Sequence, residues 1–187
     1  RAVSTPIVKL TIDQRQIEAR PGETVLQAAR RHGIDIPHFC YHDKLSITGS
    51  CRICLVKVNN LPKLQPACNL AVAPNMVVET GVEQVQKARE DVLQFILLNH
   101  PVDCGICDKA GECKLQDYQH KYGPAESISR DPKHHKRKLH DLGPRITLDN
   151  ERCILCSRCV RFTREISGSS ALGIVERGSH SYVEAQT

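Results

Sequence analysis

The sequence has little of the material from which a large hydrophobic core is built. Its 187 residues include three Phe, four Tyr, one Met and no Trp. Apolar stretches such as Phe95–Leu98 are far shorter than the roughly 20 residues that a membrane-spanning helix needs, and no segment resembles a signal peptide. We therefore expect small modules that are held together partly by metal, without a membrane span.

Motifs of substrate chemistry are also missing. The sequence contains no G-x-G-x-x-G fingerprint, no P-loop, and no arrangement of Ser, His and Asp or of paired carboxylates that suggests a catalytic site. We therefore predict no catalytic residue and no nucleotide site.

Cysteine, by contrast, is abundant. The ten Cys fall into three tight groups that contain Cys-x-x-Cys steps. An even number of Cys is also typical of a secreted disulfide framework, which is the alternative interpretation. The grouping, the missing export signal and the cytosolic character of the Lys, Arg and Glu content favour metal binding.

The first group has the spacing C-x10-C-x2-C-x13-C and consists of Cys40, Cys51, Cys54 and Cys68. Four thiolates with this irregular spacing suit a 2Fe-2S cluster better than zinc, whose sites usually show two closely spaced pairs. The small polar residues of Ser46–Ser50 can point backbone N–H groups at an anionic cluster. His38 and His42 flank Cys40 and are alternative ligands, but with four Cys available we predict that they are only neighbours.

The second group combines one imidazole with three thiolates in the pattern H-x3-C-x2-C-x5-C, formed by His100, Cys104, Cys107 and Cys113. Gly105 and Gly111 allow the backbone to turn tightly around a metal centre. Imidazole in place of a thiolate makes a site less negative and raises its potential. The pattern predicts a metal cluster with mixed ligation.

The third group is the run C-x2-C-x2-C of Cys153, Cys156 and Cys159. Three closely spaced thiolates are typical of three corners of a 4Fe-4S cluster. In the bacterial ferredoxin pattern a fourth Cys would stand at position 163, which is Thr163 here, and no Cys follows Cys159. The fourth ligand is therefore missing from this sequence.

The formal net charge of +5 at pH 7 raises the alternative of nucleic-acid binding. Clusters with four or three thiolates carry about −2 or −1, so three clusters would lower the sum by about 4. The basic run from Lys133 to Lys138 has no interleaved aromatic residues. We interpret it as a solvated loop or one that docks on an acidic partner, and predict no nucleic-acid partner.

Residues 1–80 predict an α+β module. A hairpin, a helix capped by Thr24 and stopped by Gly33, and later strands suggest a β-grasp fold. The predicted elements are strands from Ile7 to Ile12, Gln16 to Ala19, Ile53 to Val58 and Met76 to Glu79, and a helix from Val25 to His32.

Residues 81–122 predict a small helical module around the second Cys group. Thr80 and Glu83 have the spacing of a capping box, and Pro101 stops the helix after Asn99. Its apolar positions are Val85, Ala88, Val92 and Phe95 or Ile96. A second helix is expected from Glu112 to Tyr122. Residues 123–187 are expected to be a linker and the start of a third, truncated module.

Five stretches together resemble a known family over essentially the whole chain. The chain resembles the N-terminal iron–sulfur region of the NuoG-type, or 75 kDa, subunit of respiratory complex I (NADH:quinone oxidoreductase). The stretches are Ile36–His42, Gly49–Val56, Asn99–Cys104, Gly111–Asp117 and Arg152–Phe162.

The resemblance implies one 2Fe-2S cluster and two 4Fe-4S clusters. The first Cys group would hold the 2Fe-2S cluster. His100 and the Cys of the second group would hold one 4Fe-4S cluster. The other would bind the third group and a distant Cys beyond Thr187, so that the chain is an N-terminal fragment. A β-grasp ferredoxin-like domain, a small helical domain and a partial 4Fe-4S ferredoxin-like domain are implied in this order.

The resemblance also implies an iron–sulfur subunit that passes single electrons from NADH and flavin towards quinone. Its partners would be an NADH- and FMN-binding flavoprotein subunit and other subunits of the peripheral arm. It would lie on the cytoplasmic side of a bacterial inner membrane, or on the matrix side in mitochondria. The alternatives are the diaphorase iron–sulfur subunit of an NAD-linked hydrogenase or formate dehydrogenase, and a zinc-binding interaction module.

Overall fold

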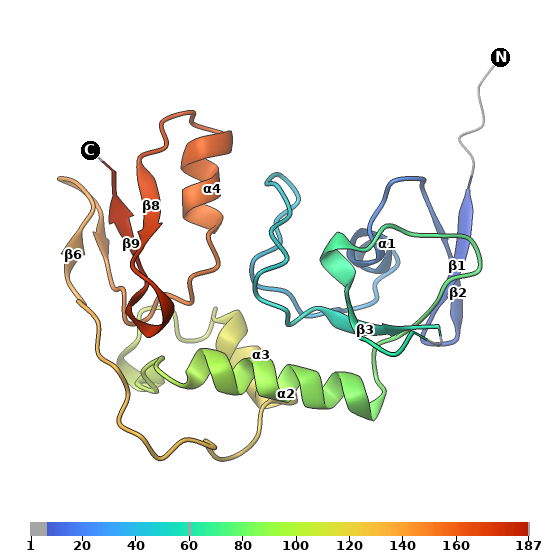
Figure 1. The fold of residues 1–187 in the computed structure, drawn as a ribbon, viewed down its shortest axis with the longest axis horizontal. Coiled ribbons are helices and arrows are strands. Elements are labelled where there is room, and N and C mark those ends of the chain that lie inside the picture. Colours follow the sequence, from blue (N-terminus) through green and yellow to red (C-terminus); the bar gives the residue numbers. More distant parts are fainter. Residues whose placement is uncertain (1–6, 60, 187) are drawn as a thin grey trace. The chain divides into compact units, whose positions relative to one another are not determined.

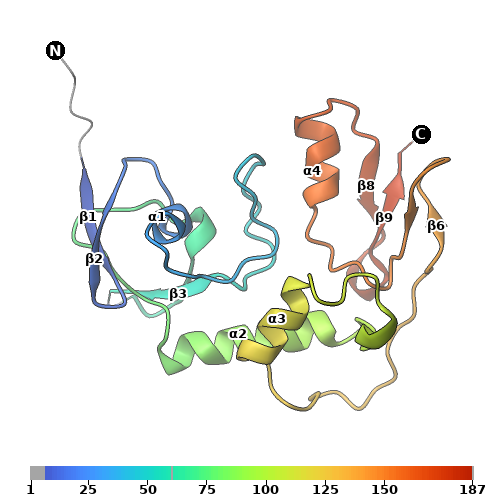
Figure 2. The same cartoon turned by 180° about the vertical axis from the view of Figure 1, so that it is seen from behind.

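The structure is a computed structural model that describes residues 7–59 and 61–186. The chain forms two compact units, whose elements are labelled in Figure 1 and seen from behind in Figure 2. The first unit consists of Arg1–Phe39 and Ile47–Val92, and the second of Cys40–Ser46 and Leu93–Thr187. No helix among the described residues is both long and apolar enough to cross a membrane.

A five-stranded mixed sheet forms the centre of the first unit. Its order is β2-β1-β5-β3-β4, with β1 and β5 parallel and the other neighbours antiparallel. The strands are β1 (Val8–Ile12), β2 (Arg15–Ala19), β3 (Leu55–Val58), β4 (Gln65–Pro66) and β5 (Val77–Glu79). The predicted strands and the α+β class are confirmed, and β4 was not predicted.

Helix α1 (Val25–Arg31) supplies the other part of this core. Gln27 N–H donates to Thr24 Oγ1 at 3.3 Å, and Thr24 N–H donates to Gln27 Oε1 at 2.9 Å, so a reciprocal capping box fixes its start. Its apolar side chains and alternate residues of the sheet, such as Leu10 and Ile17, are buried. The predicted cap at Thr24 is confirmed.

The second predicted capping box, at Thr80, is wrong. Helix α2 (Glu83–Leu97) begins at Glu83, so Thr80 lies too far upstream to be its N-cap. Thr80 instead donates from its N–H and its Oγ1 to the carboxylate of Asp13, at 2.7 and 2.5 Å. A tertiary contact with the β1–β2 turn therefore competes successfully with the local capping motif.

The buried face of α2 also differs from the prediction. Val85 and Leu93 are fully buried with Arg89 between them, whereas Phe95 is 78% exposed. The buried positions after Val85 thus include Arg89 rather than Ala88. At the end of the helix, Lys133 Nζ donates to the carbonyls of Leu97 and Leu98, which satisfies orphaned C=O groups.

The second unit is built from short elements with few buried apolar side chains. Two antiparallel ladders pair β6 with β7 and β8 with β9. The elements are α3 (Lys114–Tyr122), β6 (His140–Asp141), β7 (Thr147–Leu148), α4 (Arg158–Glu165), β8 (Leu172–Val175) and β9 (Tyr182–Ala185). The predicted helix at α3 is confirmed, whereas β6, β7, α4, β8 and β9 were not predicted. Among the described residues from 93 onwards, the buried apolar side chains are Leu93, Leu115, Tyr118 and Val183.

Candidate metal centres

Cys54 and Cys68 are brought together at the end of the β3–β4 ladder. Ala67 N–H donates to the carbonyl of Cys54 at 3.0 Å, so the segment before β3 that carries Cys54 lies against the segment after β4 that carries Cys68. Both are buried, and Cys68 lies in a short 3-10 helix, Ala67–Asn69. Arg52, with a φ of 58°, turns the backbone between Cys51 and Cys54. Three of the four predicted thiols of the first group thus belong to one unit, and Cys40 lies buried in the Cys40–Ser46 segment of the other.

His100 follows the end of α2 and is oriented by its own backbone neighbour. Its Nδ1 lies 2.8 Å from the carbonyl of Pro101 and can only donate to that oxygen, which leaves Nε2 as the ring atom for a metal when the ring is neutral. Burial lowers the pKa of the His100 imidazole, against the opposing effect of the Pro101 carbonyl. A neutral ring with Nε2 available is the form that binds metal.

The three Cys of the second group lie on a tight chain reversal that leads into α3. A short 3-10 turn, Cys104–Ile106, begins at Cys104 and ends just before Cys107. The N–H of Cys107 donates to the carbonyl of Cys104 at 3.3 Å. Gly111 adopts a φ of 82°, as expected for a turn that requires glycine. Cys113 is the N-cap of α3, where the helix dipole favours a thiolate or an anionic cluster.

The third group is the one whose thiols interact most clearly. Burial raises the pKa of the Cys153 thiol, the N–H of Leu155 opposes this, and the nearby Cys156 and Cys159 raise it further. Burial and Cys156 likewise raise the pKa of Cys159. Leu155 and Ser157 take left-handed backbone conformations, which fold the segment back on itself. The raised pKa values of the Cys153 and Cys159 thiols fit a site whose cation stabilises their thiolates.

An ion pair ties the second group to the third. Arg152 Nη2 lies 2.9 Å from Asp103 Oδ2, and this contact lowers the pKa of the Asp103 carboxyl. Asp103 in turn raises the pKa of the Arg152 guanidinium. Asp103 directly precedes Cys104 and Arg152 directly precedes Cys153. The opposite charges at equivalent places before two Cys motifs are the signal in the sequence from which this pair could have been predicted.

The basic run after residue 132 has a partner in its own chain. Glu151, whose side chain is 3% exposed, accepts from Lys138 Nζ at 2.8 Å and pairs with His135 Nδ1 at 2.6 Å. Lys138, and then His135, lower the pKa of the Glu151 carboxyl. The interpretation as a merely solvated or partner-docking loop is therefore incomplete, because part of this run neutralises a buried carboxylate beside Cys153.

The donor set consists of thiolates and one imidazole, which iron–sulfur clusters accept as ligands. Among the described residues, no three His, Cys, Asp or Glu side chains converge tightly enough for a single ion. A single zinc ion, with Zn–S bonds of about 2.3 Å, would need its sulfurs within roughly 4 Å of one another. Thiolates with one imidazole are also the ligands that such clusters prefer.

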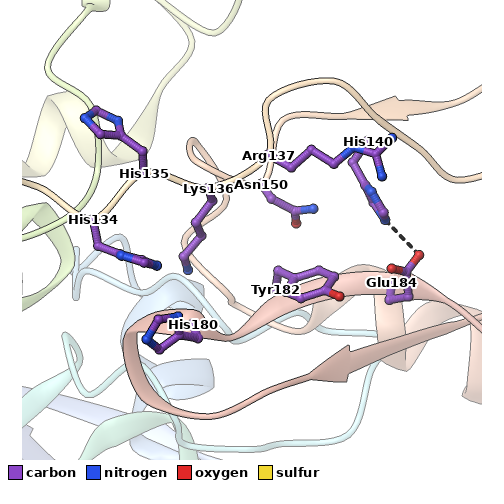
Figure 3. Close-up of a pocket in the computed structure, with 9 residues that line it drawn as sticks. All are labelled: His134, His135, Lys136, Arg137, His140, Asn150, His180, Tyr182 and Glu184. Atoms are coloured by element: carbon purple, nitrogen blue, oxygen red, sulfur yellow. Dashed lines mark hydrogen bonds and ion pairs between the residues drawn. The ribbon is translucent and has the colours of Figure 1, made fainter.

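A separate cavity of about 310 Å³ lies beside the β6 and β9 strands of the second unit (Figure 3). The rings of His134 and His180 pack edge-to-face there with centroids 4.4 Å apart, and His140 Nε2 lies 2.7 Å from Glu184 Oε1. No cysteine lines this cavity. It is therefore distinct from the candidate metal centres.

Three family models match consecutive parts of the chain. Residues 5–83 match a 2Fe-2S iron-sulfur cluster binding domain. Residues 89–127 match the NADH-ubiquinone oxidoreductase-G iron-sulfur binding region, and residues 143–187 match the ferredoxin-like domain of NADH-quinone oxidoreductase subunit 3. The chain thus contains a 2Fe-2S binding domain followed by further iron–sulfur regions.

Individual proteins are similar over nearly all of the chain. A NuoG-type subunit of NADH-quinone oxidoreductase from Rhizobium meliloti is 48% identical over 92% of this chain and 20% of its own length. The NuoG-type subunit of Rickettsia bellii is 45% identical over 95% of this chain and 27% of its own length. The mitochondrial 78 kDa subunit of NADH-ubiquinone oxidoreductase from Neurospora crassa is 45% identical over 92% of this chain and 23% of its own length.

A solved structure is also similar. A chain of an NAD+-reducing [NiFe]-hydrogenase matches with a TM-score of 0.86 at 33% identity, over 96% of this chain and 75% of that chain. The chain spans only 20% to 27% of the length of the NuoG-type and 78 kDa relatives named above. Their identity of 45% to 48% exceeds that of the hydrogenase chain. The chain belongs to the family of the iron–sulfur region of the NuoG-type, or 75 kDa, subunit of NADH-quinone oxidoreductase.

Proposed function

We propose that this chain carries single electrons from a flavin, reduced by NADH, towards quinone as the iron–sulfur region of a complex I subunit. The observation that carries the proposal is the occurrence of three ligand groups, each at the spacing of a cluster site, in a chain that is 45% to 48% identical to NuoG-type proteins. Iron–sulfur clusters, when bound, take up and release one electron at a time.

The proposed ligands are the residues predicted from the sequence. Cys40, Cys51, Cys54 and Cys68 would hold a 2Fe-2S cluster. His100 with Cys104, Cys107 and Cys113 would hold a 4Fe-4S cluster. Cys153, Cys156 and Cys159 would hold a second one, with a fourth Cys outside this sequence. The three family matches, at residues 5–83, 89–127 and 143–187, support modules at residues 1–80, 81–122 and 123–187.

The protein's own contribution is to hold and tune these centres. Pro101 fixes the His100 ring through its carbonyl, and the start of α3 directs its positive end towards Cys113. The Asp103–Arg152 ion pair holds two ligand segments against each other. Each of these contacts restricts the conformational freedom of a ligand segment. It therefore limits how far the protein reorganises when the charge of a bound cluster changes.

The partners that this function requires are a flavoprotein subunit that oxidises NADH and other subunits of the peripheral arm. Exposed apolar side chains such as Phe95, Val102 and Ile106 are consistent with such contacts. We place the protein at the cytoplasmic face of a bacterial inner membrane, or at the matrix face in mitochondria.

A second candidate is the diaphorase iron–sulfur subunit of an NAD-linked hydrogenase. The similarity to a chain of an NAD+-reducing [NiFe]-hydrogenase favours it. The length of the full gene product separates the two. A long domain after the fourth Cys supports the complex I subunit, whereas a stop soon after that Cys supports the diaphorase.

Metal analysis of the anaerobically purified protein tests the proposed function. We expect iron and acid-labile sulfide in nearly equal amounts and bleaching of the visible spectrum by dithionite. NADH alone should leave the spectrum unchanged, because the sequence has no nucleotide-binding motif. Bound zinc without sulfide would overturn the proposal, and rapid reduction by NADH alone would overturn the need for a flavoprotein partner.

Replacing His100 by Cys tests the mixed ligation of the middle cluster. We expect His100→Cys to retain the cluster and to lower its midpoint potential, because a fourth thiolate makes the site more negative. His42→Cys, also beside a cysteine motif, is the matched control and should leave this potential unchanged. An EPR-monitored redox titration measures both, and equal potentials in the His100 variant and the wild type would show that His100 is not a ligand.

A further inference from the structure

Arg161 on helix α4 is among the largest fully buried side chains of the molecule. The residue is 2% exposed, although it carries a permanent positive charge. Its guanidinium donates to the backbone carbonyls of Cys40, Ser46 and Cys156 and to the hydroxyl of Ser157. All of these residues belong to the second unit.

The guanidinium of Arg161 is hydrogen-bonded, but none of its hydrogen-bond partners among the described residues supplies a counter-charge. Among the described residues its partners are all neutral oxygen atoms, and no ion pair includes it. Glu165, one helical turn further along α4, accepts instead from the N–H and Oγ of Ser46 and pairs with Arg164. A buried cation without a counter-charge is unfavourable unless an anion lies close to it.

Two of the carbonyls that Arg161 binds belong to proposed ligands of different clusters. Cys40 is assigned to the 2Fe-2S cluster and Cys156 to the third Cys group. These residues lie 121 and 5 positions from Arg161 in the sequence. A 2Fe-2S or 4Fe-4S cluster with four thiolates carries about −2, so the missing counter-charge has two natural sources.

We propose that Arg161 is a positioning residue shared by the 2Fe-2S cluster and the 4Fe-4S cluster of Cys153, Cys156 and Cys159. Its planar fork fixes the peptides of Cys40 and Cys156 relative to each other. Its positive charge stabilises the added electron on both clusters and so raises both potentials. The inference rests on the proposed cluster ligands.

Arginine suits both roles better than lysine does. A guanidinium presents five N–H donors in a rigid plane, so it can bind several carbonyls from different segments at once. Lysine would keep the charge but, as a flexible point charge, would hold fewer of these carbonyls. Glutamine would keep two N–H donors on a neutral group. The two substitutions therefore separate the charge from the hydrogen bonds.

The test compares Arg161→Gln and Arg161→Lys in the full-length protein within its complex. Arg164→Gln is the matched control, because Arg164 lies on the same helix with its side chain 62% exposed. Iron and sulfide contents and EPR-monitored midpoint potentials of both clusters are measured. We expect Arg161→Gln to lower the reduction equilibrium constant of each cluster about tenfold, which is about 59 mV for one electron. Arg161→Lys should keep both potentials, and the control should match the wild type.

Three outcomes would overturn the inference. Full clusters at wild-type potentials in Arg161→Gln would show that the positive charge of Arg161 does not affect either potential. A shift of only one potential would show that Arg161 is not shared by the two clusters. Loss of both clusters from both Arg161 variants would make Arg161 a residue required for folding alone. Wild-type protein without iron and sulfide would instead refute the proposed function, so the two failures are distinguishable.

Discussion

Cys51→Ser is expected to abolish the EPR signal of the binuclear cluster and to leave the 4Fe-4S signals in place. A hydroxyl is a far poorer ligand for iron than a thiolate, and no other described Cys lies between Gly49 and Ile53 to replace it. Cys51 lies in the first unit, whereas the proposed 4Fe-4S ligands all lie in the second. The loss should therefore be confined to one cluster.

Ser50→Ala is the matched control for this substitution. Ser50 is exposed and adjacent to Cys51, so its variant tests whether any change in this loop disturbs the cluster. Iron content and low-temperature EPR spectra of the reduced proteins are compared at equal protein concentration. An intact binuclear signal in Cys51→Ser would remove Cys51 from the ligand set, and loss of all signals would show that the clusters assemble as one cooperative system.

Local patterns predicted the parts of this molecule that local physics determines. The alternation of apolar and polar residues predicted β1 and β2, and Thr24 predicted the start of α1, because both effects act over a few residues. The spacing of the Cys groups predicted candidate ligand sets for the same reason. The cluster assignment of each residue stays a prediction.

The failures involve contacts between segments that are distant in the sequence. Thr80 has the spacing of a cap but binds Asp13, which lies 67 residues earlier. The role of Arg161 could not be found from local patterns, because its partner Cys40 comes from a distant segment. Helix α4 was missed because Arg, Cys and Thr interrupt its apolar residues, and its burial depends on a buried arginine rather than on an apolar stripe.

Removal of the clusters is expected to unfold the second unit much more than the first. From residue 93 onwards the described buried apolar side chains are few, and both ladders have only two strands, which are marginal on their own. Buried charged groups such as Glu151 and Arg161 weaken this interior further. Metal binding must then supply much of the folding free energy of this unit. The first unit keeps a five-stranded sheet and a capped helix that bury apolar side chains without metal.

Hydrogen exchange measured by mass spectrometry, before and after iron is removed with dithionite and a chelator, tests this expectation. Amides from residue 93 onwards should lose most of their protection, as should the segment Cys40–Ser46, which Arg158 and Arg161 bind. Strands β1 and β2 and helix α1 should keep theirs, and they serve as an internal control. Equal loss in both units would mean that the apolar core of the first unit is insufficient by itself. Full protection of the second unit after iron removal would refute the role of the clusters in holding it together, because the apolar side chains and ion pairs of this unit would then suffice.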